Sequence, residues 1–339
     1  MAMQRIHAAN ELGNGSRKVC LAIGVFDGVH LGHQQIIRQT VADARQHDAV
    51  ALVVTFDRHP KVVVAPDQAP RQIYSPSQKH RTIESLGVDA VWEIHFDKPF
   101  SEKPADEFIR ELARDLGKIH SICVGAAFVF GHLRTGNVAL LKTLGAELHF
   151  QVHGLAAVAL DGQPVSSTRV REMIRTGNFD AASQMLGRPY AISGHVIHGQ
   201  QLGRQLGESS ARAADGFRTL NVRFDHPKPA AAGIFAVRTH GLLEQPLDGV
   251  ASLGVRPTVE DRGRVLLEVH CLDWPAALGP EGGYGKIISV ELLHKLRDEA
   301  RYDGLDALTA AIAQDAVNAR AFFAAHAALS RQTSRDRIR

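Results

Sequence analysis

Two nearly continuous apolar runs, separated by an amphipathic segment, constrain the fold of this chain more than any other feature. The runs are VCLAIGVF at residues 19–26 and AVALVVTF at residues 49–56. A strand buried on both faces of a parallel sheet has this apolar character. Between the runs, residues 31–47 carry apolar side chains at helical spacing on one face. The pattern predicts a β-α-β unit with a right-handed crossover.

The same alternation continues through the first half of the chain. Further strands are predicted at residues 88–96, 119–124 and 147–152, and residues 167–186 favour two short helices separated at Gly177. Strands that alternate with helices are typical of an open parallel sheet covered on both faces. The first half is therefore expected to be a doubly wound α/β domain.

The pattern changes near residues 187–189, where Gly-Arg-Pro interrupts it. The segments that follow alternate apolar and polar residues with period two, which predicts an antiparallel barrel or sandwich; they are residues 192–198, 233–239, 265–272 and 287–293. Residues 305–329 predict one amphipathic helix whose apolar stripe is Leu308, Ile312, Ala316, Ala319 and Phe323. A length of 339 residues favours two domains, which we place at 17–186 and 187–329.

Composition narrows the classes of function. Apolar residues make up 45% of the chain, and the formal charge of +3 is too small to indicate a nucleic-acid partner, although it is compatible with small anionic ligands. The first residues lack a secretory signal, and the longest apolar run is too short to cross a bilayer. Three distant cysteines imply no disulfide framework. We therefore expect a cytoplasmic protein that acts on small molecules, with no nucleic-acid or membrane partner.

The stretch GVFDGVHLGH, residues 24–33, follows the first predicted strand and enters the first helix. Ligands of open parallel sheets bind beyond the carboxyl ends of the strands, and a helix N-terminus suits phosphate. Gly28 allows a tight turn, and Gly32 keeps the start of the helix uncrowded. His30 and His33 are three residues apart and share a face of the first turn. Asp27 either caps the helix or orients a neighbouring group.

This stretch resembles the HxGH signature of nucleotidyltransferases and, more narrowly, the G-x-F-D-G-x-H-x-G-H motif of bacterial FAD synthetases. Four further segments resemble the same family in the same order: TFDRHP at 55–60, VGAAFVFGHLRTGN at 124–137, SSTRVR at 166–171 and LGRPY at 186–190. The chain departs from the family pattern at Arg58, which replaces a proline, and at Ala127, which replaces an aspartate.

The resemblance implies transfer of an adenylyl group from ATP to FMN, with Mg²⁺ bridging phosphates. It assigns His30, His33 and Arg171 to catalysis. Hydroxyls of SSTRVR can cap the helix that begins there, and either Arg169 or Arg171 can bind phosphate oxygens. The residues expected to bind nucleotide or flavin are Gly24, Phe26, Asp27, Gly28, Gly32, His59, Phe128, Arg134, Ser167, Thr168 and Arg169.

The second half resembles the riboflavin kinase module of bifunctional bacterial enzymes. The similar segments are GHVIHGQQLGRQLG at 194–207, GIFAV at 233–237, GVASLGVRPTV at 249–259, LLEVHCLDW at 266–274 and YGKIISVELLHKLRDE at 284–299. The resemblance implies that Glu268 is the general base for the riboflavin hydroxyl. It also implies that Gly203 and Arg204 contact the nucleotide, and that Thr219 and Asn221 hold Mg²⁺.

One departure affects the kinase expectation. The family joins G-R-x-x-G directly to G-F-P-T-A-N, whereas here ESSARAAD at 208–215 separates GRQLG from GFRTLN. Either the insertion is a surface loop that leaves Thr219 and Asn221 in place, or the kinase site is inactive. The sequence therefore predicts a bifunctional enzyme that makes FMN from riboflavin and FAD from FMN. The alternatives are an FAD synthetase with an inactive kinase domain and a flavin-binding regulatory protein without catalytic activity.

Overall fold

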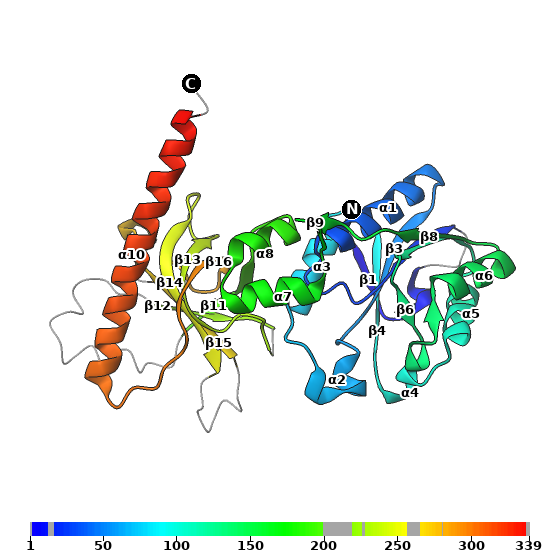
Figure 1. Cartoon of the computed structure of the whole chain (residues 1–339), viewed down its shortest axis with the longest axis horizontal. Coiled ribbons are helices and arrows are strands. Elements are labelled where there is room, and N and C mark those ends of the chain that lie inside the picture. The colour runs from blue at the N-terminus through cyan, green and yellow to red at the C-terminus, as the bar shows by residue number, and fades with distance from the viewer. Residues whose placement is uncertain are drawn as a thin grey trace. The chain divides into compact units, whose positions relative to one another are not determined.

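The computed structural model describes residues 2–12, 17–198, 219–225, 228–255, 265–279 and 281–336. The chain divides into two units (Figure 1). The first comprises Met1–Val170 and Met185–Gly187, and the second comprises Arg171–Gln184 and Arg188–Arg339. Residues 171–184 thus pack with the second unit, and the domain boundary expected after residue 186 stays a prediction.

A six-stranded parallel sheet organises the first unit, in the order β1-β4-β3-β2-β5-β8. Its strands are β1 (Gln4–Ile6), β2 (Val19–Ile23), β3 (Val50–Phe56), β4 (Ala90–Ile94), β5 (Ile119–Gly125) and β8 (Gln151–Leu155). The central strand β2 is buried throughout, which explains its continuous apolar run. From β2 the chain adds β3 and β4 on one side and β5 and β8 on the other. This reversal confirms the doubly wound prediction, and in sheets of this kind ligands bind at the point of reversal, which predicts a site at the carboxyl end of β2.

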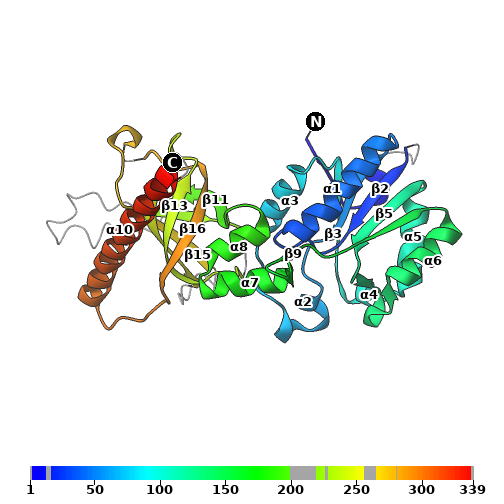
Figure 2. The same ribbon diagram turned by 45° about the horizontal axis from the view of Figure 1, so that its top comes forward.

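Helices cover both faces of this sheet, as Figure 2 allows the reader to follow. One face packs on α1 (Leu31–Gln46) and α3 (Pro76–Glu84), which bury Ile37 and Ile83 against the strands. The other face packs on α5 (Ala105–Leu116) and α6 (Val138–Leu148). Two short helices, α2 (Lys61–Val64) and α4 (Lys98–Ser101), lie in the connections that follow β3 and β4.

The strand expected at residues 147–152 was placed too early. Glu147 and Leu148 end α6, His149 turns the chain with a left-handed φ of 61°, and β8 begins only at Gln151. Two short antiparallel pairs complete the unit: β6 (Val129–Phe130) with β7 (Gly136–Asn137), and β9 (Ala159–Leu160) with β10 (Gln163–Pro164).

A closed antiparallel barrel organises the second unit, in the order β11-β12-β15-β14-β13-β16. The strands are β11 (Ala191–Ile197), β12 (Thr219–Arg223), β13 (Gly233–His240), β14 (Leu247–Val255), β15 (Val265–Cys271) and β16 (Ile287–Arg297). Of the two predicted alternatives, the structure confirms the barrel and not the sandwich. Strands β12 and β14 were not predicted, although the other four were.

Helices α7 (Ser167–Thr176) and α8 (Phe179–Leu186) are separated at Gly177, as predicted. Gly177 has a φ of 80°, and a Cβ there would lie 2.7 Å from the Cβ of Lys295. Within the second unit, the Phe179 ring packs edge-on against Phe235 with centroids 5.7 Å apart.

The terminal helix α10 (Leu305–Asp336) is longer than expected, and its predicted apolar stripe was partly wrong. Ala316 and Ala319 are buried against the barrel, but Leu308 and Ile312 are 37% and 46% exposed. The bidentate ion pair between Arg297 and Asp315 fixes the middle of the helix to β16. In the part of the chain that the structure describes, no helix has the length and apolar character needed to span a bilayer.

Candidate functional site

The loop between β2 and α1 has a strained backbone. Phe26 and Val29 have left-handed φ values of 52° and 40°, and Gly28 between them has a φ of 78°. A left-handed backbone conformation costs about 1–3 kcal/mol for each non-glycine residue that adopts it, and such strained residues are often found at functional sites. A Cβ on Gly28 would lie 2.8 Å from Cδ1 of Ile73, so the position requires glycine for space as well as for conformation.

The two histidines of the loop stack on each other at the start of α1. Their ring centroids are 3.7 Å apart with an interplanar angle of 19°. His30 is the N-cap, and its Nδ1 accepts a hydrogen bond of 3.4 Å from the backbone N–H of His33. Because Nδ1 accepts, the proton of the neutral His30 ring is assigned to Nε2, which is then a donor. The sequence expectation that both rings share the first helical turn is therefore met.

Gly32 leaves the space that the His30 ring occupies. A Cβ at this position would lie 3.2 Å from Cε1 of His30. The edge of the His33 ring packs on Phe26, with centroids 5.2 Å apart. At this helix N-terminus, backbone N–H groups and two imidazoles are gathered, which is an arrangement suited to an anion.

Asp27 orients a neighbouring segment, whereas the helix cap expected as its other role belongs to His30. Its buried carboxylate accepts hydrogen bonds from the backbone N–H groups of Ile73, at 3.0 and 3.1 Å, and Tyr74, at 3.2 Å. Its backbone carbonyl accepts a hydrogen bond of 2.9 Å from the Ser167 hydroxyl. Asp27 thus joins the histidine loop to the segment before α3 and to the start of α7.

Gln34 was missed by the sequence analysis. Its buried side-chain amide donates to the carbonyl of Val29 at 2.9 Å and to the carbonyl of Leu186 at 2.7 Å. The amide therefore holds the strained residue that precedes His30. A polar side chain on the buried face of an amphipathic helix, one turn before Ile37, is the signal that could have found it.

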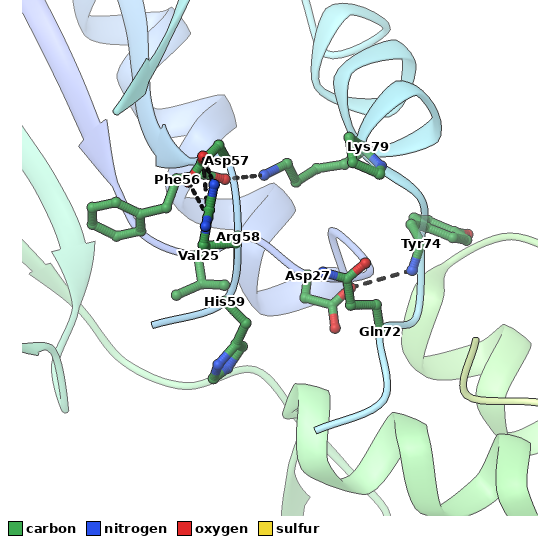
Figure 3. Close-up of a pocket in the computed structure, with 10 residues that line it drawn as sticks. Val25, Asp27, Phe56, Asp57, Arg58, His59, Gln72, Tyr74 and Lys79 are labelled. Atoms are coloured by element: carbon green, nitrogen blue, oxygen red, sulfur yellow. Dashed lines mark hydrogen bonds and ion pairs between the residues drawn. The ribbon is translucent and has the colours of Figure 1, made fainter. Parts of the chain in front are cut away.

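A pocket opens at the carboxyl ends of β2 and β3 (Figure 3). Three segments meet there: the end of β2, the end of β3, and the loop that leads into α3. The lining residues are Val25, Asp27, Phe56, Asp57, Arg58, His59, Gln72, Tyr74, Pro76 and Lys79. Two of them, Asp27 and His59, were expected to bind ligand, and the buried lysine was not foreseen.

Arg58 and Asp57 form an ion pair at this pocket, with Nη2 and Oδ2 2.9 Å apart. Burial alone would raise the pKa of the Asp57 carboxyl. Hydrogen bonds from Arg58, from the backbone of Phe96 and from His95 outweigh it, so the pKa lies below its ordinary value. The arginine that replaces the family's proline is therefore bound to a carboxylate that stays ionised.

Several expected residues lie around the start of α7. Ser166 caps this helix by accepting from the backbone N–H of Arg169 at 3.3 Å, and Thr168 is exposed. The Arg169 guanidinium donates to the carbonyls of Leu160 and Gln163, each at 3.1 Å, in the β9–β10 hairpin. Arg169 is thus engaged with backbone oxygens. Arg171 is half-buried one turn after Thr168 on α7, in the second unit.

Phe128 and Arg134 lie in the segment between β5 and β7. The Phe128 ring stacks on Phe130 with centroids 5.3 Å apart, and Ala127 beside it is exposed. Arg134 is exposed with a φ of 59°, directly after Leu133 with a φ of 51°. Neither Phe128 nor Arg134 lines the pocket described above.

The barrel brings three of the expected kinase residues, Thr219, Asn221 and Glu268, together. In the register of β12 and β15, Asn221 lies opposite Glu268, and Thr219 lies opposite His270. The intervening Leu220 is buried, so Thr219 and Asn221 point to the same face. Opposed residues of antiparallel strands have Cβ atoms roughly 5 Å apart. Gly203, Arg204 and the insertion at 208–215 lie outside the described residues.

Comparisons with known proteins agree with this architecture. A family model for FAD synthetase matches residues 14–169, and a model for riboflavin kinase matches residues 186–323. A solved structure titled as a macrolide-efflux protein from Streptococcus pneumoniae superposes with a TM-score of 0.71 and 25% identity, over 94% of this chain and 99% of that one.

Curated relatives match over nearly the whole length. Bifunctional riboflavin kinase/FMN adenylyltransferase of Escherichia coli K12 is 36% identical over 95% of this chain and 98% of its own. The proteins of the same name from Haemophilus influenzae and Pseudomonas fluorescens are 33% and 35% identical, over 94% and 95% of this chain and 97% and 98% of theirs. With both modules present in the same order, the chain belongs to the bifunctional riboflavin kinase/FMN adenylyltransferase family.

Proposed function

We propose that the first unit transfers the adenylyl group of ATP to FMN through the loop that carries His30 and His33. The observation that carries this proposal is the stacked imidazole pair at the N-terminus of α1. Nε2–H of His30 and the ring of His33 bind phosphate oxygens of the nucleotide, where negative charge grows during the reaction. The resemblance to FAD synthetases also assigns Arg171 to nucleotide phosphate, and we carry this assignment as part of the proposal.

The reaction requires no nucleophile from the protein. An oxygen of the FMN phosphate attacks the α-phosphorus of ATP, the bond from that phosphorus to the β-phosphate oxygen breaks, and pyrophosphate leaves. The residues align the two substrates and stabilise charge. Gly24, Phe26, Asp27, Gly28 and Gly32 shape the loop.

The remaining ligand contacts of this unit are assigned to residues on several segments. The resemblance to FAD synthetases assigns His59 at the pocket to the flavin side. Its Nδ1 accepts from the backbone N–H of Lys61 at 3.2 Å, so Nε2 of the neutral ring is assigned as a donor. Phe128 and Arg134 are assigned to the flavin side as well, and Ser167 and Thr168 to the nucleotide side.

We propose that the barrel phosphorylates riboflavin. Glu268 takes the proton of the 5′-hydroxyl, whose oxygen attacks the γ-phosphorus of ATP and releases ADP. The Thr219 hydroxyl and the Asn221 side-chain carbonyl are hard oxygen donors on one face, next to Glu268, and they fit a Mg²⁺ ion. When bound, Mg²⁺ neutralises phosphate charge. Gly203 and Arg204 are assigned to the nucleotide.

The three cysteines support a reducing, cytoplasmic location, because all of them are free thiols.

Purified protein given Mg²⁺-ATP with either riboflavin or FMN tests the proposed activities, with products separated by chromatography. FAD from both substrates supports both activities. FAD from FMN alone indicates an inactive barrel, and no product from either substrate contradicts catalysis altogether.

A further inference from the structure

Lys79, in the first turn of α3, is a buried cation at the pocket. Its side chain lies below the surface, with 8% of the residue exposed. A lysine is almost never buried to this extent unless partners compensate its charge. No motif in the sequence marks it, and the proposed reaction assigns it no role. Its position between the end of β3 and the pocket (Figure 3) therefore requires an explanation.

The Lys79 ammonium is bonded to the carboxyl end of β3. Its Nζ donates to the carbonyl of Phe56 at 2.9 Å and to the hydroxyl of Thr55 at 3.3 Å. The Thr55 hydroxyl in turn donates to the carbonyl of Val25 at 3.1 Å. One side chain of α3 thus connects the ends of both β2 and β3. Val25 immediately precedes the strained loop that contains the histidine pair, and Phe56 begins the segment that leads to His59.

Charges around Lys79 come from three elements. Asp27 after β2, Asp57 after β3 and Glu93 on β4 act on the ammonium, while burial opposes its charged form and lowers its pKa. Among the residues that the structure describes, Nζ is bonded to neutral oxygens and forms no ion pair with a carboxylate. The position of the ammonium is therefore determined by its bonds to the Phe56 carbonyl and the Thr55 hydroxyl, and through these bonds Lys79 can hold both oxygens in place.

We propose that Lys79 is a positioning residue for adenylyl transfer, which sets the separation of the histidine loop and the His59 segment by binding the ends of β2 and β3. The inference rests on the proposed function of the first unit. Reacting groups that are misplaced by about 1 Å can lose roughly 100-fold in rate. Loss of the ammonium should therefore reduce kcat more than it raises KM.

Lys79→Met tests the proposal, because methionine approximates the length of the chain and removes the donors. In the full-length protein we expect kcat for FAD formation from FMN to fall at least tenfold, with KM for FMN and ATP changed less than threefold. Riboflavin phosphorylation by the barrel of the same molecules serves as the internal control and should stay unchanged. Lys98→Met, at an exposed position on α4, is the matched control and should keep full activity.

Thr55→Val is the alternative variant with which to test the proposal if Lys79→Met does not fold. It keeps the ammonium, its bond to the Phe56 carbonyl and the shape of the site, and it removes the hydroxyl that accepts from Lys79 and donates to Val25, so we expect an intermediate loss of kcat. Lys79→Arg, which retains donors, should recover part of the rate. Unchanged kcat in Lys79→Met or in Thr55→Val, or a loss that appears only as a higher KM, would overturn the role of Lys79. Absence of FAD formation by the wild type would instead refute the proposed function.

Discussion

Gln34→Leu is the substitution whose cost follows most directly from the structure. Leucine removes the two hydrogen bonds that the buried amide donates to Val29 and Leu186. Loss of a donor from a buried carbonyl costs about 1–3 kcal/mol for each carbonyl. Added apolar burial returns about 1–2 kcal/mol. The central values, about 4 kcal/mol lost and about 1.5 kcal/mol regained, leave a fall of about 2.5 kcal/mol in the free energy of unfolding of the first unit.

Urea denaturation followed by tryptophan fluorescence measures this change. The chain has two tryptophans, of which Trp92 lies in the first unit and Trp274 in the second. In a Trp274→Phe background the signal reports the first unit alone. Gln35→Leu is the matched control, because Gln35 is the exposed neighbour on the same helix, and its effect should stay within about 0.5 kcal/mol. If Gln34→Leu also changed the free energy of unfolding by no more than about 0.5 kcal/mol, with an unchanged m-value, the reasoning would be refuted.

Three further predictions concern charge and thiols. The His80 imidazole, whose Nε2 lies 3.0 Å from Oε1 of Glu93, lowers the pKa of the Glu93 carboxyl against the effect of burial. The stability that Glu93 contributes is therefore present above pH 4.5 and is lost as the pH falls through the folded-state pKa, and acid titration of unfolding should show a shallower loss in His80→Leu. Burial raises the pKa of Cys123 to about 12, so iodoacetamide at pH 8 should label it only after unfolding, and rapid labelling of the native protein would contradict the buried site. Asp315→Asn removes the charge that pairs with Arg297 and should destabilise the docking of α10 by about 1.5–3 kcal/mol, seen as faster proteolysis of that helix.

Local patterns were sufficient for much of the fold. Strands β2 and β3 could be predicted because continuous apolar runs indicate strands buried on both faces. The break between α7 and α8 could be predicted because Gly177 allows a backbone conformation that interrupts a helix. The missed strand β14, LDGVASLGV, contains Ala251, Ser252 and two glycines, which weaken its alternation. Leu308 and Ile312 have helical spacing, but α10 contacts the barrel farther along its length, which no local pattern encodes.

The site was predictable where its residues are adjacent in the chain. His30 and His33 lie in one motif, whereas Asp27 bonds to residues 46 and 47 positions away, and a long-range bond of this kind leaves no local signature. Lys79 was missed for the same reason, because its partners belong to β3 and nothing in the sequence of α3 distinguishes a buried lysine from a solvated one.

The central claim is that the imidazole pair at the start of α1 stabilises the phosphates during adenylyl transfer. His30→Asn combined with His33→Gln removes both rings, while asparagine keeps the N-cap. The decisive measurement is the rate of FAD formation from FMN beside the rate of FMN formation from riboflavin in the same preparation. The account predicts at least a 100-fold loss of the first with the second unchanged. Full retention of FAD formation, or equal loss of both activities, would contradict it.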